Sequence, residues 1–207
     1  MTHIGIIGTG HMATHLARGW LDAGHHVQFG SRYSETKANL PKQSPAARIV
    51  SNYEAVQSAE VVVIAIPFTA VKPFAQQHAD LLRNKLVIDI SNPFEHLPDN
   101  RIAGAEITAQ AIGAGARVVA AFKANFWQTL LEPIDPKSGI VRDVHYVGDH
   151  DADKAIVAQL ITDLGFQPVD CGVLRNARVL DSMVPLIVEL DRRLGADHRF
   201  SWKLLGN

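Results

Sequence analysis

Residues 4–13 join an apolar run, a glycine-rich turn and the start of a helical pattern, and this order constrains the fold more than any other feature. The apolar run is Ile-Gly-Ile-Ile at residues 4–7, which fits a short buried strand. Gly8 and Gly10 follow, and apolar residues then recur at helical spacing, which predicts an amphipathic helix directly after the turn. The apolar positions of this predicted helix are Ala13, Leu16, Ala17, Trp20 and Leu21.

Further apolar runs alternate with helical patterns along the first 125 residues. Strands that are apolar on both faces and separated by helices form a parallel sheet that is covered on both sides. We therefore expect an α/β fold of the Rossmann type: a doubly wound, mainly parallel sheet with helices on both faces. One helix is predicted to contain Phe74, Leu81 and Leu82 together. The further predicted strands lie at residues 27–29, 48–50, 61–66, 86–90 and 118–122.

The chain after residue 125 has a different pattern. An irregular stretch contains Pro133, Pro136 and Gly139. Two short strand-like runs follow it, and each leads to a helical pattern. We expect one domain over residues 1–207, with a nucleotide-binding core at 1–125 and a short α/β C-terminal extension at 126–207. The extension is predicted to hold strands at 144–147 and 168–171 and a final helix at about 175–194.

Composition excludes several classes of protein. Twenty Lys and Arg residues against 21 Asp and Glu residues leave a formal charge of −1, so a strongly basic nucleic-acid surface is not expected. The longest apolar run, residues 61–68, is far shorter than the roughly 20 residues of a membrane-spanning helix. A single cysteine, Cys171, excludes an intrachain disulfide. We expect a cytoplasmic protein that binds neither nucleic acid nor membrane.

The glycine-rich turn predicts a dinucleotide site. Gly8-Thr9-Gly10-His11-Met12-Ala13 reads G-x-G-x-x-A, and it stands between a strand and a helix, where that pattern has meaning. The first glycine permits a tight turn, the second lets the backbone approach a diphosphate, and Ala13 keeps the helix close to the strand. The N–H groups and positive end of the helix then face the phosphates.

The residues after the second strand predict which dinucleotide is bound. An NAD site usually has Asp or Glu at this point, whereas this chain has Gly30-Ser31-Arg32 and no acid before Glu35. A hydroxyl and a guanidinium suit a 2′-phosphate. Ser31 and Arg32 therefore favour NADP(H), and Lys37 is close enough in sequence to contribute.

Topology places the rest of the site at the carboxyl ends of the strands. Three residues after the fourth strand, Ala65, Ile66 and Pro67, should border the nicotinamide half of the cofactor, and Asn92 should follow along the groove. Residues 122–125 end the sixth strand near the reactive ring. Trp127 either walls that region or belongs to the core.

Other candidate sites are weaker. His11 and His15 have helical spacing, but no neighbouring Glu and no third ligand accompany them, so no metal site is predicted. Cys171 has no activating base nearby in sequence and is expected to be inert. Asp89, inside an apolar run, fits a buried hydrogen-bonded role at least as well as a ligand contact.

These features resemble the NADP-dependent oxidoreductases that use coenzyme F420, a deazaflavin. The resemblance rests on the Gly-Thr-Gly turn, on Gly30-Ser31-Arg32, on Ala121-Phe122 and, most specifically, on the run from residue 164 to 178. That run reads Leu-Gly-Phe, then Pro-Val-Asp, then Leu-Arg-Asn-Ala-Arg. The cytosolic reductase domain of the membrane ferric reductases is also similar.

The resemblance implies hydride transfer between NADP(H) and a flat acceptor such as coenzyme F420 or a flavin, with no essential catalytic acid, base or nucleophile. It also implies an acceptor pocket at Lys123, Asn125 and Trp127, and a homodimer formed through the C-terminal helix. The alternative for this helix is that its apolar face packs on the sheet of its own chain. Lys123 departs from the family, where Asn or His commonly follows the Ala-Phe pair. The alternatives are an NADP-dependent reductase of a small imine or 3-hydroxy acid, and a non-catalytic NADP(H) sensor.

Overall fold

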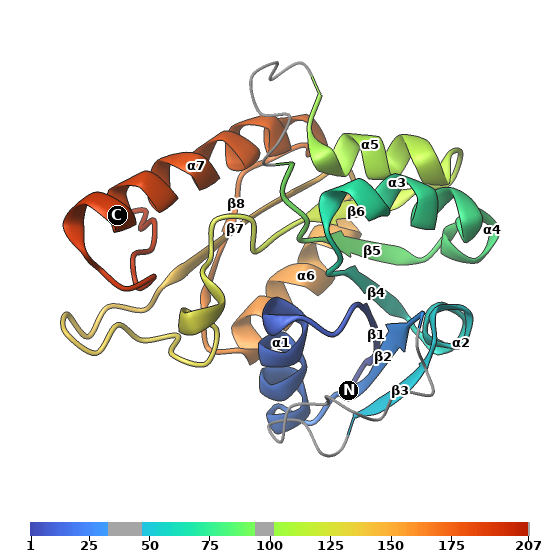
Figure 1. Cartoon of the computed structure of the whole chain (residues 1–207), viewed down its shortest axis with the longest axis horizontal. Helices are drawn as coiled ribbons and strands as arrows, with labels where there is room; N and C mark the ends of the chain where they lie inside the picture. The colour runs from blue at the N-terminus through green and yellow to red at the C-terminus, as the bar shows by residue number, and fades with distance from the viewer. Residues whose placement is uncertain (33–46, 94–101, 207) are drawn as a thin grey trace.

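The computed structural model describes residues 1–32, 47–93 and 102–206. Within them, eight strands form a sheet in the order β3-β2-β1-β4-β5-β6-β7-β8 (Figure 1). The first six strands are parallel, β7 runs antiparallel to β6, and β8 runs parallel to β7. The strands are β1 (His3–Ile7), β2 (His26–Ser31), β3 (Arg48–Ser51), β4 (Val61–Ile64), β5 (Leu86–Asp89), β6 (Arg117–Ala120), β7 (Asp143–Gly148) and β8 (Gln167–Asp170).

Helices cover both faces of this sheet. Two of them pack on one face: α1 (His11–Asp22) and α6 (Asp151–Asp163). The other face carries α2 (Asn52–Ser58), α3 (Phe68–Gln77), α4 (Ala79–Leu82), α5 (Gly104–Ile112) and α7 (Ala177–Leu194). Two short 3-10 helices, η3 (Trp127–Thr129) and η4 (Leu174–Asn176), follow β6 and β8. None of the helices in the described ranges is long and apolar enough to cross a bilayer.

Side-chain alternation along the strands explains the two layers. In β4, Val61 and Val63 face the α1 side, and Val62 and Ile64 face the α2 side. All four are buried, as expected for a strand covered on both faces. The two helices on the first face are joined by Trp20 of α1, whose indole donates a hydrogen bond to the Leu160 carbonyl of α6 at 3.0 Å.

The architecture confirms the predicted fold class, with differences in detail. The helix predicted to contain Phe74, Leu81 and Leu82 is divided, because the chain leaves helical geometry at His78, between α3 and α4. The last helix begins as the 3-10 turn η4 and then continues as α7 through Pro185. A capping box starts α2: the Ser51 hydroxyl and the Glu54 carboxylate each accept a backbone N–H of the other residue.

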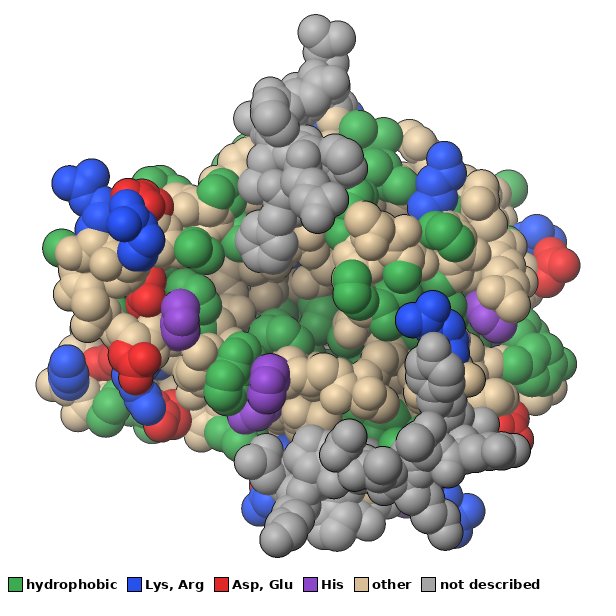
Figure 2. All heavy atoms as spheres, in the orientation of Figure 1, with side chains coloured by type: hydrophobic (Ala, Val, Ile, Leu, Met, Phe, Trp, Pro, Cys, Tyr) green, Lys and Arg blue, Asp and Glu red, His purple; other side chains and the backbone are tan. Residues whose placement is uncertain are grey.

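The sheet creates a crevice where its connections change sides. α1 leaves β1 on one face, and α3 leaves the neighbouring strand β4 on the opposite face. In an open parallel sheet, ligands bind at such a point, beyond the carboxyl ends of the strands. In the space-filling view this face is hollowed at its centre, with apolar side chains in the hollow and histidines at its rim (Figure 2).

Candidate functional site

Gly8 connects three segments at the crevice. Its φ of 111° lies in the region that favours glycine. Its N–H donates to the Gly30 carbonyl at 3.0 Å, which ties the turn to the end of β2. A Cβ at Gly8 would lie 2.4 Å from the Ala65 carbonyl oxygen, so only glycine lets the turn pack against the segment after β4. The structure therefore brings Gly8, Gly30 and Ala65 together.

The start of α1 is open to an anion. Gly10 is its N-cap, no side chain in the described part of the chain caps the helix, and its first turn holds no acidic residue. Among the described residues, no atom lies within 4 Å of a Cβ built at Gly10, so this part of the chain leaves the space beside Gly10 clear. Thr9 and His11 are exposed, and Met12 is half-buried. Free N–H groups at a helix N-terminus bind phosphate, and this arrangement fits the diphosphate of a dinucleotide.

Ser31 and Arg32 lie at the end of β2, next to this turn. Ser31 is half-buried and pairs in register with Ser51 of β3, and Arg32 is exposed. Lys37, the further basic residue considered for a 2′-phosphate, lies outside the described residues.

The segment after β4 forms the other side of the turn. The Ala65 N–H donates to the Ile7 carbonyl at 2.9 Å, and Ile66 packs on the cluster beneath α2 and α3. Pro67 is the N-cap of α3. These residues adjoin the glycine turn, which is the position that topology predicted for them.

The chain bends sharply after β6. Phe122 is buried and has a φ of 57°, which is uncommon for a residue with a side chain. Its ring packs edge-on against Trp20, with centroids 6.2 Å apart. The bend directs the next residues along the crevice. Among them, Asn125 donates from its side-chain amide to the Asp143 carbonyl at 3.1 Å, which joins this loop to the start of β7.

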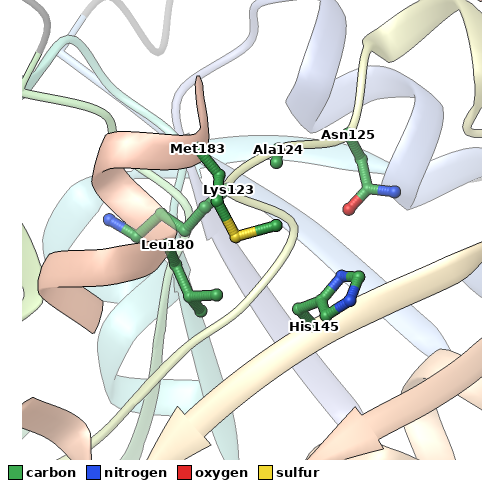
Figure 3. A pocket seen from close by; sticks show the side chains of 6 residues that line it. All are labelled: Lys123, Ala124, Asn125, His145, Leu180 and Met183. Atoms are coloured by element: carbon green, nitrogen blue, oxygen red, sulfur yellow. The ribbon is translucent and has the colours of Figure 1, made fainter. Parts of the chain in front are cut away.

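The side chain of Lys123 is buried under its own loop and does not extend into the predicted acceptor pocket. Its side chain is 1% exposed, and its ammonium lies between Asp89 and Asp181. Figure 3 shows the ammonium directed away from Asn125 and His145. Lys123 also lines the adjacent cavity. Asn92 is half-buried, and its amide donates to the Lys123 carbonyl at 3.0 Å.

A small cavity lies between this loop, β7 and α7 (Figure 3). Its volume is about 10 Å³, which is room for one water molecule. This cavity is too small to hold a flat ring. Sequence reasoning missed three of its residues because they come from distant segments without a local motif. The lining residues are Lys123, Ala124, Asn125, His145, Leu180 and Met183.

His145 is the titratable side chain that faces this cavity from β7. Burial lowers its pKa below the ordinary value of 6.5, the Asp143 carboxylate works in the opposite direction, and Lys203 adds to the lowering. Since the net shift is downward, His145 is a neutral imidazole at neutral pH, able to donate one hydrogen bond and accept another.

Trp127 lies against the start of α1. Its indole stacks on the His11 imidazole, and the His15 ring lies 4.9 Å away at a tilted angle. The predicted wall of the acceptor pocket is thus next to the diphosphate turn, because η3 crosses from β6 to α1.

The remaining candidates have structural partners. Asp89 is fully buried and accepts hydrogen bonds from Ser91 and Thr108. Burial, the largest effect, raises the pKa of the Cys171 thiol above 9.0, which makes it a poor nucleophile. Across the described ranges, no three His, Cys, Asp or Glu residues gather in a metal-binding arrangement.

Comparison with known proteins agrees with this geometry. Residues 3–93 match the family described as NADP oxidoreductase, coenzyme F420-dependent. The chain is 30% identical to the F420-dependent NADP reductase of Methanothermobacter thermautotrophicus, over 90% of this chain and 87% of that one. It is 32% identical to the metalloreductase STEAP3 of Rattus norvegicus over 88% of this chain, which spans 36% of that protein.

Solved structures of other proteins share the fold of this chain. A candidate F420-dependent NADP reductase from Arthrobacter sp. FB24 superposes with a TM-score of 0.89 at 26% identity, covering 100% of both chains. An imine reductase from Streptomyces aurantiacus has a TM-score of 0.69 at 16% identity, and this chain covers 63% of it, so it shares the fold alone. The reductase relative establishes the family and confirms the predicted enzyme class: the chain belongs to the coenzyme F420-dependent NADP oxidoreductases.

Proposed function

We propose that this protein transfers a hydride between NADP(H) and a deazaflavin or flavin-type ring such as coenzyme F420. The observation that carries the proposal is the junction at Gly8, which joins an uncapped helix start to the segment that bears Ser31 and Arg32. This junction offers N–H groups for a diphosphate and a cation for an additional phosphate. Relatives of similar length are named for the same pair of reactants.

Each side of the crevice has a role in this proposal. Gly8, Thr9, Gly10, His11 and Met12 hold the diphosphate, and Ser31 and Arg32 hold the 2′-phosphate. Ala65, Ile66 and Pro67 border the nicotinamide half, with Asn92 next along the groove. The loop that contains Lys123 and Asn125 lies beneath the acceptor, and Trp127 closes the crevice on the α1 side.

The reaction requires position more than acid–base chemistry. Bound NADPH supplies the hydride, and the acceptor takes up that hydride and one proton. The protein has to hold two flat rings face to face at about 3–3.5 Å, and such positioning supplies much of the acceleration. The apolar hollow in Figure 2 fits this task, because apolar walls exclude water around the rings.

The same proposal includes a homodimer formed through α7. One face of α7 is buried against the sheet, and an adjoining stripe of apolar residues repeats at helical spacing. An isologous pairing of two such helices would cover the stripe. Its members are Val179, Met183, Leu186, Leu190 and Leu194, of which Val179, Leu186 and Leu194 are more than half exposed.

We also propose that residues 1–207 act as one domain, because β7 and β8 continue the sheet of the core. A cytoplasmic location follows from the need for NADPH, a soluble intracellular cofactor. Both statements concern the setting of the reaction and not its chemistry.

The proposed function is tested by measuring NADPH oxidation with several candidate acceptors. The purified protein is mixed with NADPH and, separately, with coenzyme F420, FMN, riboflavin, a ferric chelate and a cyclic imine, and the loss of nicotinamide absorbance is followed. The proposal expects turnover with F420 or a flavin. Turnover with the imine alone would favour the imine-reductase alternative. Tight NADPH binding without turnover on any acceptor would favour a sensor.

A further inference from the structure

We propose that Lys123 is a positioning residue for hydride transfer: its buried ammonium fixes the loops after β5 and β6 that form the floor of the crevice. This inference rests on the proposed function, because it assigns Lys123 to the alignment of the two reacting rings. It assigns no contact between the ammonium and either ring, since the ammonium lies below the loop.

The ammonium lies at the centre of a fully buried cluster. Nζ is 3.5 Å from Asp89 Oδ1 and 3.3 Å from Asp181 Oδ1, and it donates to the Ser91 carbonyl. The side chains of Lys123, Asp89 and Asp181 are 1%, 0% and 4% exposed. A lysine is rarely buried to this degree unless it is paired, so the position is set by these contacts.

Lys123 and the loop after β5 are joined in both directions. The Lys123 side chain donates to the carbonyl of Ser91, and the Asn92 side chain donates to the carbonyl of Lys123 at 3.0 Å. Ser91 and Asn92 follow β5, and Lys123 follows β6. The two loops therefore hold each other at the edge where the nicotinamide and the acceptor are expected to meet.

The two carboxylates carry this connection to neighbouring helices. Asp89 accepts from the Ser91 N–H at 2.8 Å and from the Thr108 hydroxyl of α5 at 2.5 Å. Asp181 of α7 accepts from the Gly104 N–H, at the start of α5, at 2.9 Å. A single ammonium thus sets both loops against α5 and α7.

Stability alone does not account for this arrangement. Replacing a buried ion pair by apolar residues of similar volume is often neutral or stabilising. The cluster has two carboxylates for one ammonium, and burial, the largest effect, raises the pKa of Asp181 in spite of Lys123. The ammonium instead fixes the geometry of the loops. It holds the Ser91 carbonyl and the carboxylates of Asp89 and Asp181 in one arrangement, next to Phe122 with its left-handed backbone.

The test separates position from folding by keeping the charge balanced. Lys123→Met alone leaves two buried carboxylates without a cation and is expected to lower the thermal midpoint. The double variant Lys123→Met/Asp181→Asn removes one charge of each sign, so it is expected to recover most of that loss. Lys154→Met is the matched control, because Lys154 pairs with two carboxylates, Asp151 and Asp170, on the α6 side.

Three measurements are made on each variant. The first is the affinity for NADP⁺ by calorimetry. The second is the single-turnover rate of hydride transfer from NADPH to coenzyme F420, with protiated and 4-deuterated NADPH. The third is hydrogen exchange of the backbone amides in residues 90–92 and 122–125 of the protein without ligand.

For the double variant we expect a transfer rate about tenfold or more below wild type, since small displacements of reacting groups cost this much. NADP⁺ affinity should stay within about a factor of two, because the phosphate contacts lie on the opposite side of the crevice. Exchange should be faster in the two loops alone. Lys154→Met should leave rate and loop exchange unchanged.

The inference is overturned if the charge-balanced double variant transfers hydride at the wild-type rate, or if its loops exchange as slowly as those of the wild type. A loss of NADP⁺ affinity equal to the loss of rate would also contradict it. If the wild-type protein binds no NADP⁺, the proposed function fails and this inference fails with it, whereas a wild-type rate in the double variant leaves the proposed function standing.

Discussion

The indole of Trp127 lies nearly parallel to the imidazole of His11, with ring centroids 4.5 Å apart and 18° between the ring planes. Trp127 follows β6, and His11 is the first residue of α1. The stacked pair therefore joins the loop expected beneath the acceptor to the turn expected around the diphosphate.

Loss of this stacking is predicted to weaken NADPH binding. Trp127→Leu removes the aromatic partner of His11, and aromatic pairs contribute about 0.5–1.5 kcal/mol. Calorimetric titration with NADPH should show a loss of this size, and Trp127→Phe should restore most of it. Trp202→Phe, at a half-buried residue of the C-terminal segment that is not among the proposed binding residues, is the control. Unchanged affinity in Trp127→Leu would place the indole outside the binding site.

Substitutions of the two glycines in the turn are predicted to have different effects, on stability for Gly8 and on NADP⁺ affinity for Gly10. Gly8→Ala places a Cβ 2.4 Å from the Ala65 carbonyl oxygen at a φ of 111°, so it should cost about 1–3 kcal/mol of unfolding free energy in urea. The new methyl group in Gly10→Ala meets no atom of residues 1–32, 47–93 or 102–206 within 4 Å, so this variant should leave stability unchanged.

Gly10→Ala should instead reduce NADP⁺ affinity by about tenfold or more, because the new methyl group occupies the path of the diphosphate. Calorimetry on this stable variant provides the measurement, with the urea midpoint as the control for folding. A Gly10→Ala variant that binds NADP⁺ like the wild type would remove the diphosphate from this turn.

Arg32 is predicted to select the cofactor. Arg32→Ala should weaken NADPH by roughly 1–3 kcal/mol, the contribution of a charge-assisted contact, and should change NADH little. The KM values for the two cofactors give the measurement. Arg192→Ala, at an exposed position on α7, is the control. Equal losses for NADPH and NADH would contradict the role of Arg32.

Glu106 is predicted to stabilise the fold in a pH-dependent way. Burial acts to raise the pKa of Glu106, but hydrogen bonds from Arg178 and the Ala103 N–H outweigh it, so the pKa lies below 4.5. The lowered pKa means that this stabilisation is fully present above pH 4.5 and is lost as the pH falls through the folded-state value.

Glu106→Gln should therefore cost about 1 kcal/mol of unfolding free energy at neutral pH. The difference from the wild type should shrink below pH 4.5 in urea titrations. Glu189→Gln, in an exposed pair with Arg192, should show little difference at any pH. A gap that stays constant into the acid range would contradict the ion pair.

The apolar stripe on α7 is predicted to be a dimer interface. Light scattering after size exclusion should give twice the chain mass for the wild type. Leu186→Glu places a charge in the middle of the stripe and should give the single chain mass. Tyr53→Glu, at an exposed position on α2, should leave the mass unchanged. A wild-type monomer would contradict the interface.

The parts of this site that could be predicted from sequence are those that depend on local chemistry. The turn at Gly8 and Gly10 is set by backbone conformation and by the neighbouring strand and helix, and all three features lie within 20 residues. Ser31 and Arg32 follow from the same unit. The central strands β4 and β5 were predictable because their apolar runs are almost continuous.

The parts that could not be predicted depend on distant segments. Lys123, Asp89 and Asp181 are separated by 34 and 58 positions, and nothing in their local sequence indicates that they meet. The same applies to His145 and Met183 at the small cavity. The interruption of the helix at His78 could not be predicted, because the helical spacing of apolar residues continues across His78. The backbone itself is not helical at that residue.

Calorimetric titration of the wild-type protein with NADP⁺ and with NAD⁺ tests the central claim most directly, since it asks whether the crevice binds a dinucleotide with an additional phosphate. We expect one saturable site per chain and an affinity for NADP⁺ about tenfold or more above that for NAD⁺, equivalent to about 1.4 kcal/mol. No heat with NADP⁺, or equal affinities for the two dinucleotides, would contradict it.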